Sequence, residues 1–168
     1  MTCVPESSKV STMQLTSPVF SENGMIPSKY TCDGANWSLP LVISGVPSGA
    51  KSLVLLMDDP DIPDFVKQKF NITVWDHWVL FNINPQITAI AENSVPRGAL
   101  HGKNTGGKNA YGGPCPPDRE HRYYFKLYAL DTILDLPEGS TKKQVEEAMG
   151  GHVIAEARLM GRYTRYRS

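Results

Sequence analysis

Short apolar runs separated by turn residues dominate most of the chain. Runs of about four to eight apolar, β-branched or aromatic residues, bounded by Gly, Pro, Asn and Asp, are typical of strands. The expected strands are residues 13–20, 41–43, 52–57, 78–83 and 123–130. Segments 26–40 and 92–113 are rich in residues that favour turns and are predicted to be loops. A loop as long as the second one is usually functional or mobile in a compact domain.

A helical spacing appears only near the C-terminus. Thr141 and Gln144 fit a capping box, and apolar side chains within 145–149 fall on one face of the predicted helix. Two glycines then interrupt the pattern, and residues 152–160 form a second short amphipathic run. Strands first and helices last predict a mainly β protein with helices packed at one edge of the sheet.

Length and charge narrow the functional classes. A chain of 168 residues can bury a sizeable core, so we expect one domain at 13–168 preceded by a flexible polar tail at 1–12. Lys and Arg number 17, as do Asp and Glu, so no overall field favours nucleic acid or an anionic membrane. Any bound anion must therefore be held locally. The chain has no run long enough to span a bilayer and its start lacks a signal-peptide core, which predicts a cytoplasmic protein.

Three cysteines occur without CxxC spacing. The odd number favours reduced thiols in a reducing compartment. A bridge between Cys32 and Cys115 stays open as an alternative, because both lie in predicted loops that could meet near one pocket.

Three polar segments adjoin the predicted strands. Asp58-Asp59-Pro60-Asp61-Ile62-Pro63 follows one strand, and Trp75-Asp76-His77-Trp78 enters another. The third segment runs from Gly112 to Tyr123 and is stiffened by Gly and Pro before a strand begins. Each has an ordinary structural interpretation: a solvated acidic turn, a buried structural histidine, and a rigid loop.

Alternation along the last strand separates its first side chains. His121 and Tyr123 should face one side, where they can share a pocket, while Arg122 faces the other. We expect Arg122 to pair with an acid elsewhere, such as one in the Asp58–Asp61 turn.

Together these segments resemble the phosphatidylethanolamine-binding protein family, in particular its bacterial and archaeal Raf-kinase-inhibitor-like members. The similarity extends from about Met13 to Tyr163. The matching motifs are Ile26-Pro27, Tyr30-Thr31-Cys32-Asp33-Gly34, Asp59-Pro60-Asp61-Ile62-Pro63, His77-Trp78-Val79-Leu80, Gly112–Pro117, His121-Arg122-Tyr123-Tyr124-Phe125 through Leu130, Gly151-His152 and Gly161-Arg162-Tyr163.

The resemblance implies an antiparallel β-sandwich with Greek-key connections, C-terminal helices and a small anion pocket. The ligand-binding residues that it implies are Asp59, Ile62, Pro63, Trp75, His77, Gly113, Cys115, Pro117, His121 and Tyr123. It also implies a cis peptide bond at Ile62–Pro63, where such a bond costs least. Segment 64–74 is longer than in many relatives and is expected to cover or extend the mouth. Asp118, Arg119 and Glu120 add charge at the rim, so the headgroup preference stays open.

The residue set suits phosphate or a phosphorylated headgroup. Imidazoles, loop amides and the Tyr123 hydroxyl can donate hydrogen bonds, and Asp59 can accept one from an ammonium group or a protonated oxygen. We therefore expect a binding module without a cofactor. The alternative is a hydrolase or metal-dependent enzyme that uses Asp59, His77 and His121. The resemblance further implies a protein partner such as a kinase or protease, and a homodimer is left open.

Overall fold

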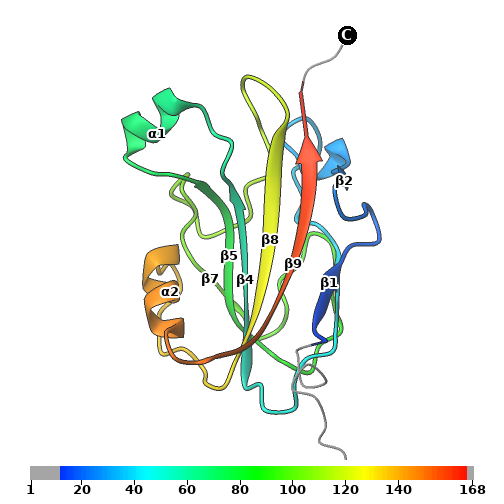
Figure 1. The fold of residues 1–168 in the computed structure, drawn as a ribbon, viewed down its shortest axis with the longest axis vertical. Helices are drawn as coiled ribbons and strands as arrows, with labels where there is room; N and C mark the ends of the chain where they lie inside the picture. Colours follow the sequence, from blue (N-terminus) through cyan, green and yellow to red (C-terminus); the bar gives the residue numbers. More distant parts are fainter. Residues whose placement is uncertain (1–11, 166–168) are drawn as a thin grey trace, which may run out of the picture.

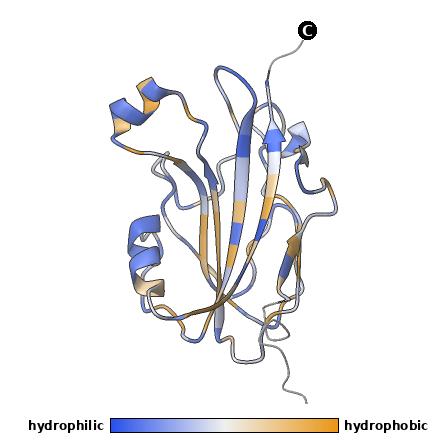
Figure 2. Ribbon diagram, in the orientation of Figure 1, coloured by the Kyte–Doolittle hydropathy of each residue, from blue (hydrophilic) through white to orange (hydrophobic). Residues whose placement is uncertain are grey.

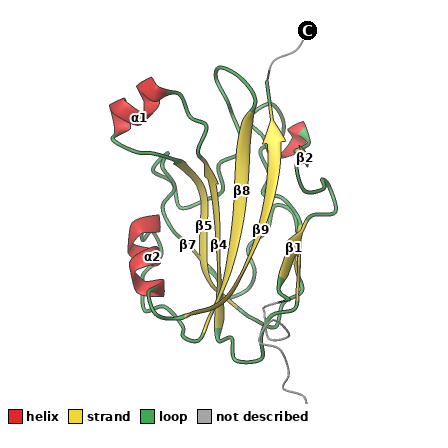
Figure 3. Cartoon of the chain, in the orientation of Figure 1, coloured by secondary structure: helices red, strands yellow, loops and turns green. Residues whose placement is uncertain are grey.

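The protein folds into two β-sheets packed face to face (Figures 1 and 3). The structure is a computed structural model that describes residues 12–165. The smaller sheet is antiparallel in the order β1-β3-β6, formed by Gln14–Thr16, Leu41–Ser44 and Ala89–Ile90. The larger sheet has the order β2-β9-β8-β4-β5-β7 and is antiparallel except where β2 joins β9. Its strands, in chain order, are β2 (Gly24–Met25), β4 (Ser52–Asp59), β5 (Trp75–Ile83), β7 (Leu100–His101), β8 (His121–Leu130) and β9 (Val153–Tyr163). The mainly β fold predicted from the sequence is thus confirmed.

The large sheet is covered on both faces along its centre. All of β4 is buried, which explains why its sequence reads as a continuous apolar run rather than an alternating one. One face packs on the small sheet through side chains such as Leu55, Leu80 and Phe125. The other face packs on helix α2 (Lys142–Met149) through Leu56, Phe81 and their neighbours. Figure 2 shows hydrophobic residues along the central strands and mainly hydrophilic ones on α2.

Helix α2 begins as the sequence predicts. The Thr141 hydroxyl accepts a hydrogen bond from the Gln144 amide, and the Gln144 side chain accepts one from the Thr141 amide, so the predicted capping box is present. Val145 and Met149 are the buried residues of the helix. None of the helices within residues 12–165 is long and apolar enough to cross a bilayer.

The helix expected at 152–160 is wrong, because this segment forms most of β9. Its residues pair with β8 from Val153↔Leu130 to Tyr163↔His121, and inward side chains such as Ala155 and Leu159 join the core. Ala, Glu, Arg, Leu and Met are good helix formers, but intrinsic propensity is a small energy, and pairing along a whole strand overrides it. Of the predicted tail at 1–12, residues 1–11 lie outside the described part of the chain.

A second helix, α1 (Asp64–Phe70), was not expected from the sequence. It connects β4 to β5 and projects beyond the ends of these two strands (Figure 1). Each of its side chains is at least partly exposed, including Phe65 at 67% and Phe70 at 47%. The two aromatic rings therefore stand on the surface rather than in the core, at the end of the sandwich where the polar segments meet.

Candidate functional site

The three polar segments meet at one end of the sandwich because β4 lies between β5 and β8. Asp59 is paired with Trp75 on one side, and Asp58 is paired with Tyr124 on the other. The last residues of β4 therefore lie beside the first residues of both neighbouring strands. Antiparallel pairing brings residues together here that are far apart in the sequence.

A cavity of about 380 Å³ opens at this end. Nine of the ten predicted site residues line it, namely Asp59, Ile62, Pro63, Trp75, His77, Gly113, Cys115, Pro117 and His121. A larger and shallower groove of about 690 Å³ runs between residues 13–22 and β9. Glu22 and Arg158 are its charged lining residues, and no histidine reaches it. The smaller cavity is therefore the candidate site, since acidic, imidazole and aromatic groups converge on it.

His121 is held between two carboxylates. Its Nδ1 lies 2.6 Å from Oδ2 of Asp59, and its Nε2 lies 2.6 Å from Oδ1 of Asp118. Burial alone would lower the pKa of His121, but these hydrogen bonds and charges outweigh it and raise the pKa above its usual range. Because a carboxylate oxygen accepts hydrogen bonds, both ring nitrogens are placed to donate, and this arrangement favours the imidazolium form of the ring.

His77 differs from His121 in protonation. Its side chain is buried, and burial lowers its pKa despite the nearby carboxylates. Nδ1 lies 2.7 Å from the carbonyl oxygen of Gly112, which can only accept, so Nδ1 carries the proton. The neutral ring therefore keeps Nε2 as an acceptor. The cavity combines one cationic imidazole that donates at both nitrogens with one neutral imidazole that donates only at Nδ1.

Tyr123 is the one predicted residue that does not line the cavity. It is fully buried, with its ring 5.3 Å from that of His77 and 6.4 Å from that of His121. Its hydroxyl has no hydrogen-bond partner among residues 12–165, and burial followed by nearby carboxylates raises its pKa well above the usual range. The phenol thus stays protonated, and its ring lies against both imidazoles.

The acids of the β4 turn have separate partners. Asp61 accepts hydrogen bonds from Nε and Nη2 of Arg122 at 2.9 and 2.8 Å, as the alternation of β8 predicts. This pairing lowers the pKa of Asp61 to about 2. Asp58 lies on the opposite face from the cavity, 3.0 Å from Lys126 and 3.8 Å from Lys142. The turn is therefore not a solvated acidic turn, and Asp59 is its carboxylate at the cavity.

A disulfide joins Cys32 to Cys115 across 83 positions of sequence. The expectation of reduced thiols is wrong for these two residues, while Cys3 lies outside the described chain. The amide of Cys32 also donates to the carbonyl of Pro114, so the two loops are already aligned. Gly113 makes this approach possible, because a Cβ there would lie 2.5 Å from the carbonyl oxygen of Tyr30. The bridge fixes the cavity wall that contains Cys115.

The cis bond expected at Ile62–Pro63 is wrong, since residues 12–165 contain no cis peptide. Pro63 is extended, with φ −60° and ψ 153°, and precedes the first turn of α1. A trans bond is the lower-energy form here and leads directly into the helix. Val66 of α1 lines the cavity, so the expectation that segment 64–74 extends the mouth agrees with the structure.

Sequence reasoning missed part of the wall. Asn36, Asn104, Lys108 and Tyr111 also line the cavity. Asn104 shapes its loop by accepting from the Lys108 amide at 3.0 Å and donating to the Ala110 carbonyl at 2.9 Å. The length and Asn/Gly content of loop 92–113 were the signal available, but they could not identify which loop side chains turn inward.

The geometry gives little support to the metalloenzyme alternative. Within residues 12–165, no three His, Cys, Asp or Glu side chains are grouped so as to hold a metal ion. Asp59 and Asp118 engage both nitrogens of His121, and a protonated nitrogen cannot be a metal ligand.

Comparison with known proteins gives the same family as the motifs. The family model described as phosphatidylethanolamine-binding protein matches residues 16–164. A UPF0098 protein of Methanothermobacter thermautotrophicus is 51% identical over 158 residues, covering 91% of this chain and 99% of the relative. A crystal structure of a putative phosphatidylethanolamine-binding protein homolog from Chlamydia trachomatis superposes with a TM-score of 0.88 at 48% identity, covering 93% and 99% of the two chains. Escherichia coli YbcL, described as a member of the mammalian PEBP family, gives 0.81 at 30% identity, covering 92% and 99%. The chain therefore belongs to the phosphatidylethanolamine-binding protein family.

Proposed function

We propose that this protein is a binding module whose cavity holds a small anion, such as phosphate or a phosphorylated headgroup. The observation that carries the proposal is the state of His121. Its charged ring forms part of the wall, and its Nε2 already donates to an anionic oxygen, that of Asp118. A site that stabilises one oxyanion on this nitrogen can accept another of similar shape.

Other wall residues suit the remaining parts of such a ligand. Lys108 supplies a second positive charge to the wall. Nε2 of neutral His77 can accept from a protonated phosphate oxygen or an ammonium group. Ile62, Val66 and Trp75 are apolar lining residues that can pack on the carbon chain of a headgroup.

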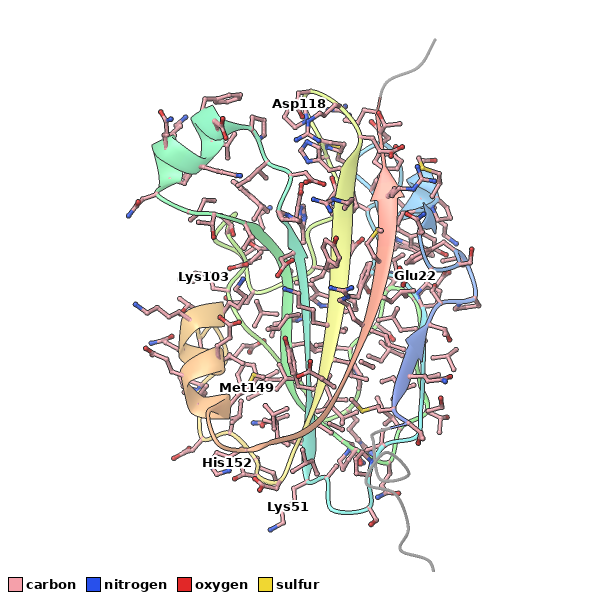
Figure 4. The ribbon with its side chains drawn as sticks, in the orientation of Figure 1. Glu22, Lys51, Lys103, Asp118, Met149 and His152 are labelled. Atoms are coloured by element: carbon pink, nitrogen blue, oxygen red, sulfur yellow. A yellow bond between two sulfur atoms is a disulfide. The ribbon has the colours of Figure 1, made fainter. Side chains whose placement is uncertain are left out.

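Calorimetric titration with inorganic phosphate and with O-phosphorylethanolamine tests the proposal. We expect saturable binding of at least one of them to the wild type and a loss of about tenfold or more in His121→Gln, because a charge-assisted hydrogen bond is removed. His152→Gln is the matched control, since His152 also pairs with a carboxylate, that of Asp131 at 2.8 Å. Figure 4 shows His152 at the opposite end of the molecule from Asp118. Equal affinities in both variants would place the anion elsewhere.

Catalysis by Asp59, His77 and His121 is the competing hypothesis. No contact described in the cavity favours catalysis over binding. A hydrolase would release phosphate from a phosphomonoester, whereas a binding module would return the ligand intact. Incubation of the purified protein with O-phosphorylethanolamine, with and without added zinc, distinguishes the two by phosphate release.

A protein partner such as a kinase or protease is a second proposal. The exposed rings of Phe65 and Phe70 on projecting α1, beside the cavity, favour it. Affinity capture with the purified protein tests it. Phe65→Ser should lose a partner that the wild type captures, whereas Ile133→Ser, which changes a similarly exposed apolar side chain at 64%, should keep it. Light scattering of the purified wild type measures whether a homodimer forms instead.

The cytoplasmic location also stays a proposal. Because disulfides persist in oxidising compartments, the Cys32–Cys115 bridge argues against it. Thiol labelling before lysis of the native host tests it directly: two reactive thiols from Cys32 and Cys115 favour the cytoplasm, and none favours an oxidising compartment.

A further inference from the structure

Asp118 reaches from the surface onto a buried ring. Its side chain is 38% exposed, whereas that of His121, the ring it contacts, is 1% exposed. The contact joins residues at positions i and i+3 across the turn that enters β8, with 2.6 Å between Oδ1 and Nε2. Asp59 contacts Nδ1 of the same ring, so Asp118 occupies the other nitrogen. Asp118 does not line the cavity itself; it lines a neighbouring groove together with Pro116 and Pro117, which line both, and it reaches His121 from there.

We propose that Asp118 is an internal competitor for the anion, whose carboxylate occupies the ligand position on His121 and determines which anions can enter. This inference rests on the proposed function of the cavity and adds to it a specificity-determining residue. Asp118 is not part of the family pocket that the sequence resemblance implied.

Tethering makes Asp118 a strong competitor against some anions and a weak one against others. A carboxylate fixed next to its partner acts at a high effective concentration, so a free monocarboxylate with equal charge and two oxygens gains nothing by replacing it. A phosphate dianion brings more charge and three acceptor oxygens, and it can displace the carboxylate. The residue therefore selects phosphate over carboxylate ligands.

The residues around Asp118 allow its carboxylate to move away from Nε2 of His121. Arg119 lies 3.8 Å from its other oxygen and is 60% exposed, so the displaced carboxylate keeps a nearby cation in solvent. The remaining charges at the cavity are Asp59, which stays on Nδ1 and preserves the imidazolium, and Lys108 in the wall. Release of Asp118 thus exposes the Nε2 donor, while Asp59 on Nδ1 continues to favour the charged form of the ring.

Glu120 provides a matched control in the same turn. Its carboxylate pairs with Arg162 at 2.9 Å rather than with His121. Asp118→Ala and Glu120→Gln therefore remove the same charge from the same loop, but only the first frees Nε2. Asp118→Asn keeps the shape of the side chain and replaces a charged acceptor with a neutral one, which should free the nitrogen only in part.

The experiment is calorimetric titration of wild type and these three variants with inorganic phosphate and, separately, with acetate. We expect phosphate to bind Asp118→Ala at least about tenfold more tightly than wild type, with Asp118→Asn between them. The phosphate affinity of Glu120→Gln should stay within about twofold of that of wild type, because a solvent-screened surface charge contributes little. Acetate should bind detectably only to the Asp118 variants. Melting temperatures verify that each variant is folded.

Two failures are distinguishable. If wild type binds phosphate and Asp118→Ala binds it no more tightly than Glu120→Gln, the inference is overturned while the anion cavity stands. If none of the four proteins binds phosphate, the proposed function fails and the inference falls with it. Binding by the Asp118 variants alone supports both.

Discussion

Oδ2 of Asp59 accepts a 2.6 Å hydrogen bond from Nδ1 of His121, although the two residues are 62 positions apart. The pair is buried where β4 ends and β8 begins. A carboxylate in this position fixes the ring orientation and favours its charged form. The contrast with neutral His77 is the basis of the functional account, because environments that separate the pKa values of two groups give them different chemical roles.

Asp59→Asn should lower the pKa of His121. The substitution retains the shape of the side chain but removes one of the two carboxylates that raise this pKa. NMR titration of the imidazole resonances measures the effect, with assignments from His121→Gln. Asp61→Asn serves as the control, because Asp61 lies in the same turn but pairs with Arg122. An unchanged His121 titration in Asp59→Asn would show that the pair does not control the charge of the ring.

Affinity for O-phosphorylethanolamine should fall as the pH rises from about 7 to about 9. The ligand stays dianionic in this range, since the second pKa of a phosphomonoester is about 6. The pKa of His121 is raised, so the ring loses its proton on the alkaline side, and the protonated ring binds the anion better. The loss should be roughly tenfold, corresponding to about 1–2 kcal/mol for a charge-assisted hydrogen bond. Calorimetry at several pH values measures it, and an affinity that increases with pH would reverse the assigned sign.

Asp61→Asn should destabilise the protein at neutral pH and weaken its acid dependence. The pKa of Asp61 is depressed to about 2 in the folded state, so its contribution is present above the unfolded pKa of about 4 and lost as the pH falls toward 2. Because solvent screens the exposed Arg122 partner, we expect the free energy of unfolding to fall by only about 1–2 kcal/mol at pH 7. Urea unfolding at pH 7 and pH 3 gives both values. An equal loss of unfolding free energy at pH 7 and pH 3 would contradict a contribution that depends on the ionisation of Asp61.

Removal of the disulfide should lower stability and loosen the cavity wall. The double substitution Cys32→Ser and Cys115→Ser is expected to lower the free energy of unfolding by about 2–4 kcal/mol, because the bridge closes a long loop in the unfolded chain. Urea unfolding of the double variant measures the cost, and wild type under reducing conditions should match it. Phosphate affinity should fall in the same samples, because Cys115 lies in the wall. Full stability and affinity without the bridge would make the disulfide incidental to the site.

Several strands and one ion pair beside the site could be predicted from the residues themselves because their signals are local, whereas the cavity residues were implied by the family resemblance. The run at 52–57 is apolar throughout because β4 is covered on both faces. The Arg122–Asp61 pair follows from alternation along β8 together with the position of the acidic turn. Both depend on patterns that span only a few residues.

What could not be predicted depends on tertiary contacts. Residues 152–160 favour a helix locally, but they form most of β9 because β8 is available for pairing. Nothing in the order Asp118-Arg119-Glu120 shows that the first carboxylate turns in to His121 while the third pairs with Arg162. Loop side chains such as Lys108 likewise line the cavity through folded loop geometry that has no sequence period.

A long-range proton–nitrogen NMR spectrum of the imidazoles, recorded during titration with inorganic phosphate, tests most directly whether Nε2 of His121 holds the anion. We expect the His121 ring to be protonated on both nitrogens before phosphate is added, and its Nε2 resonance then to shift saturably as Asp118 is displaced. His152, at the other end of the molecule, should not follow the same binding curve. A neutral His121 ring, or an Nε2 resonance that does not respond while phosphate binds, would contradict the claim that this nitrogen holds the anion.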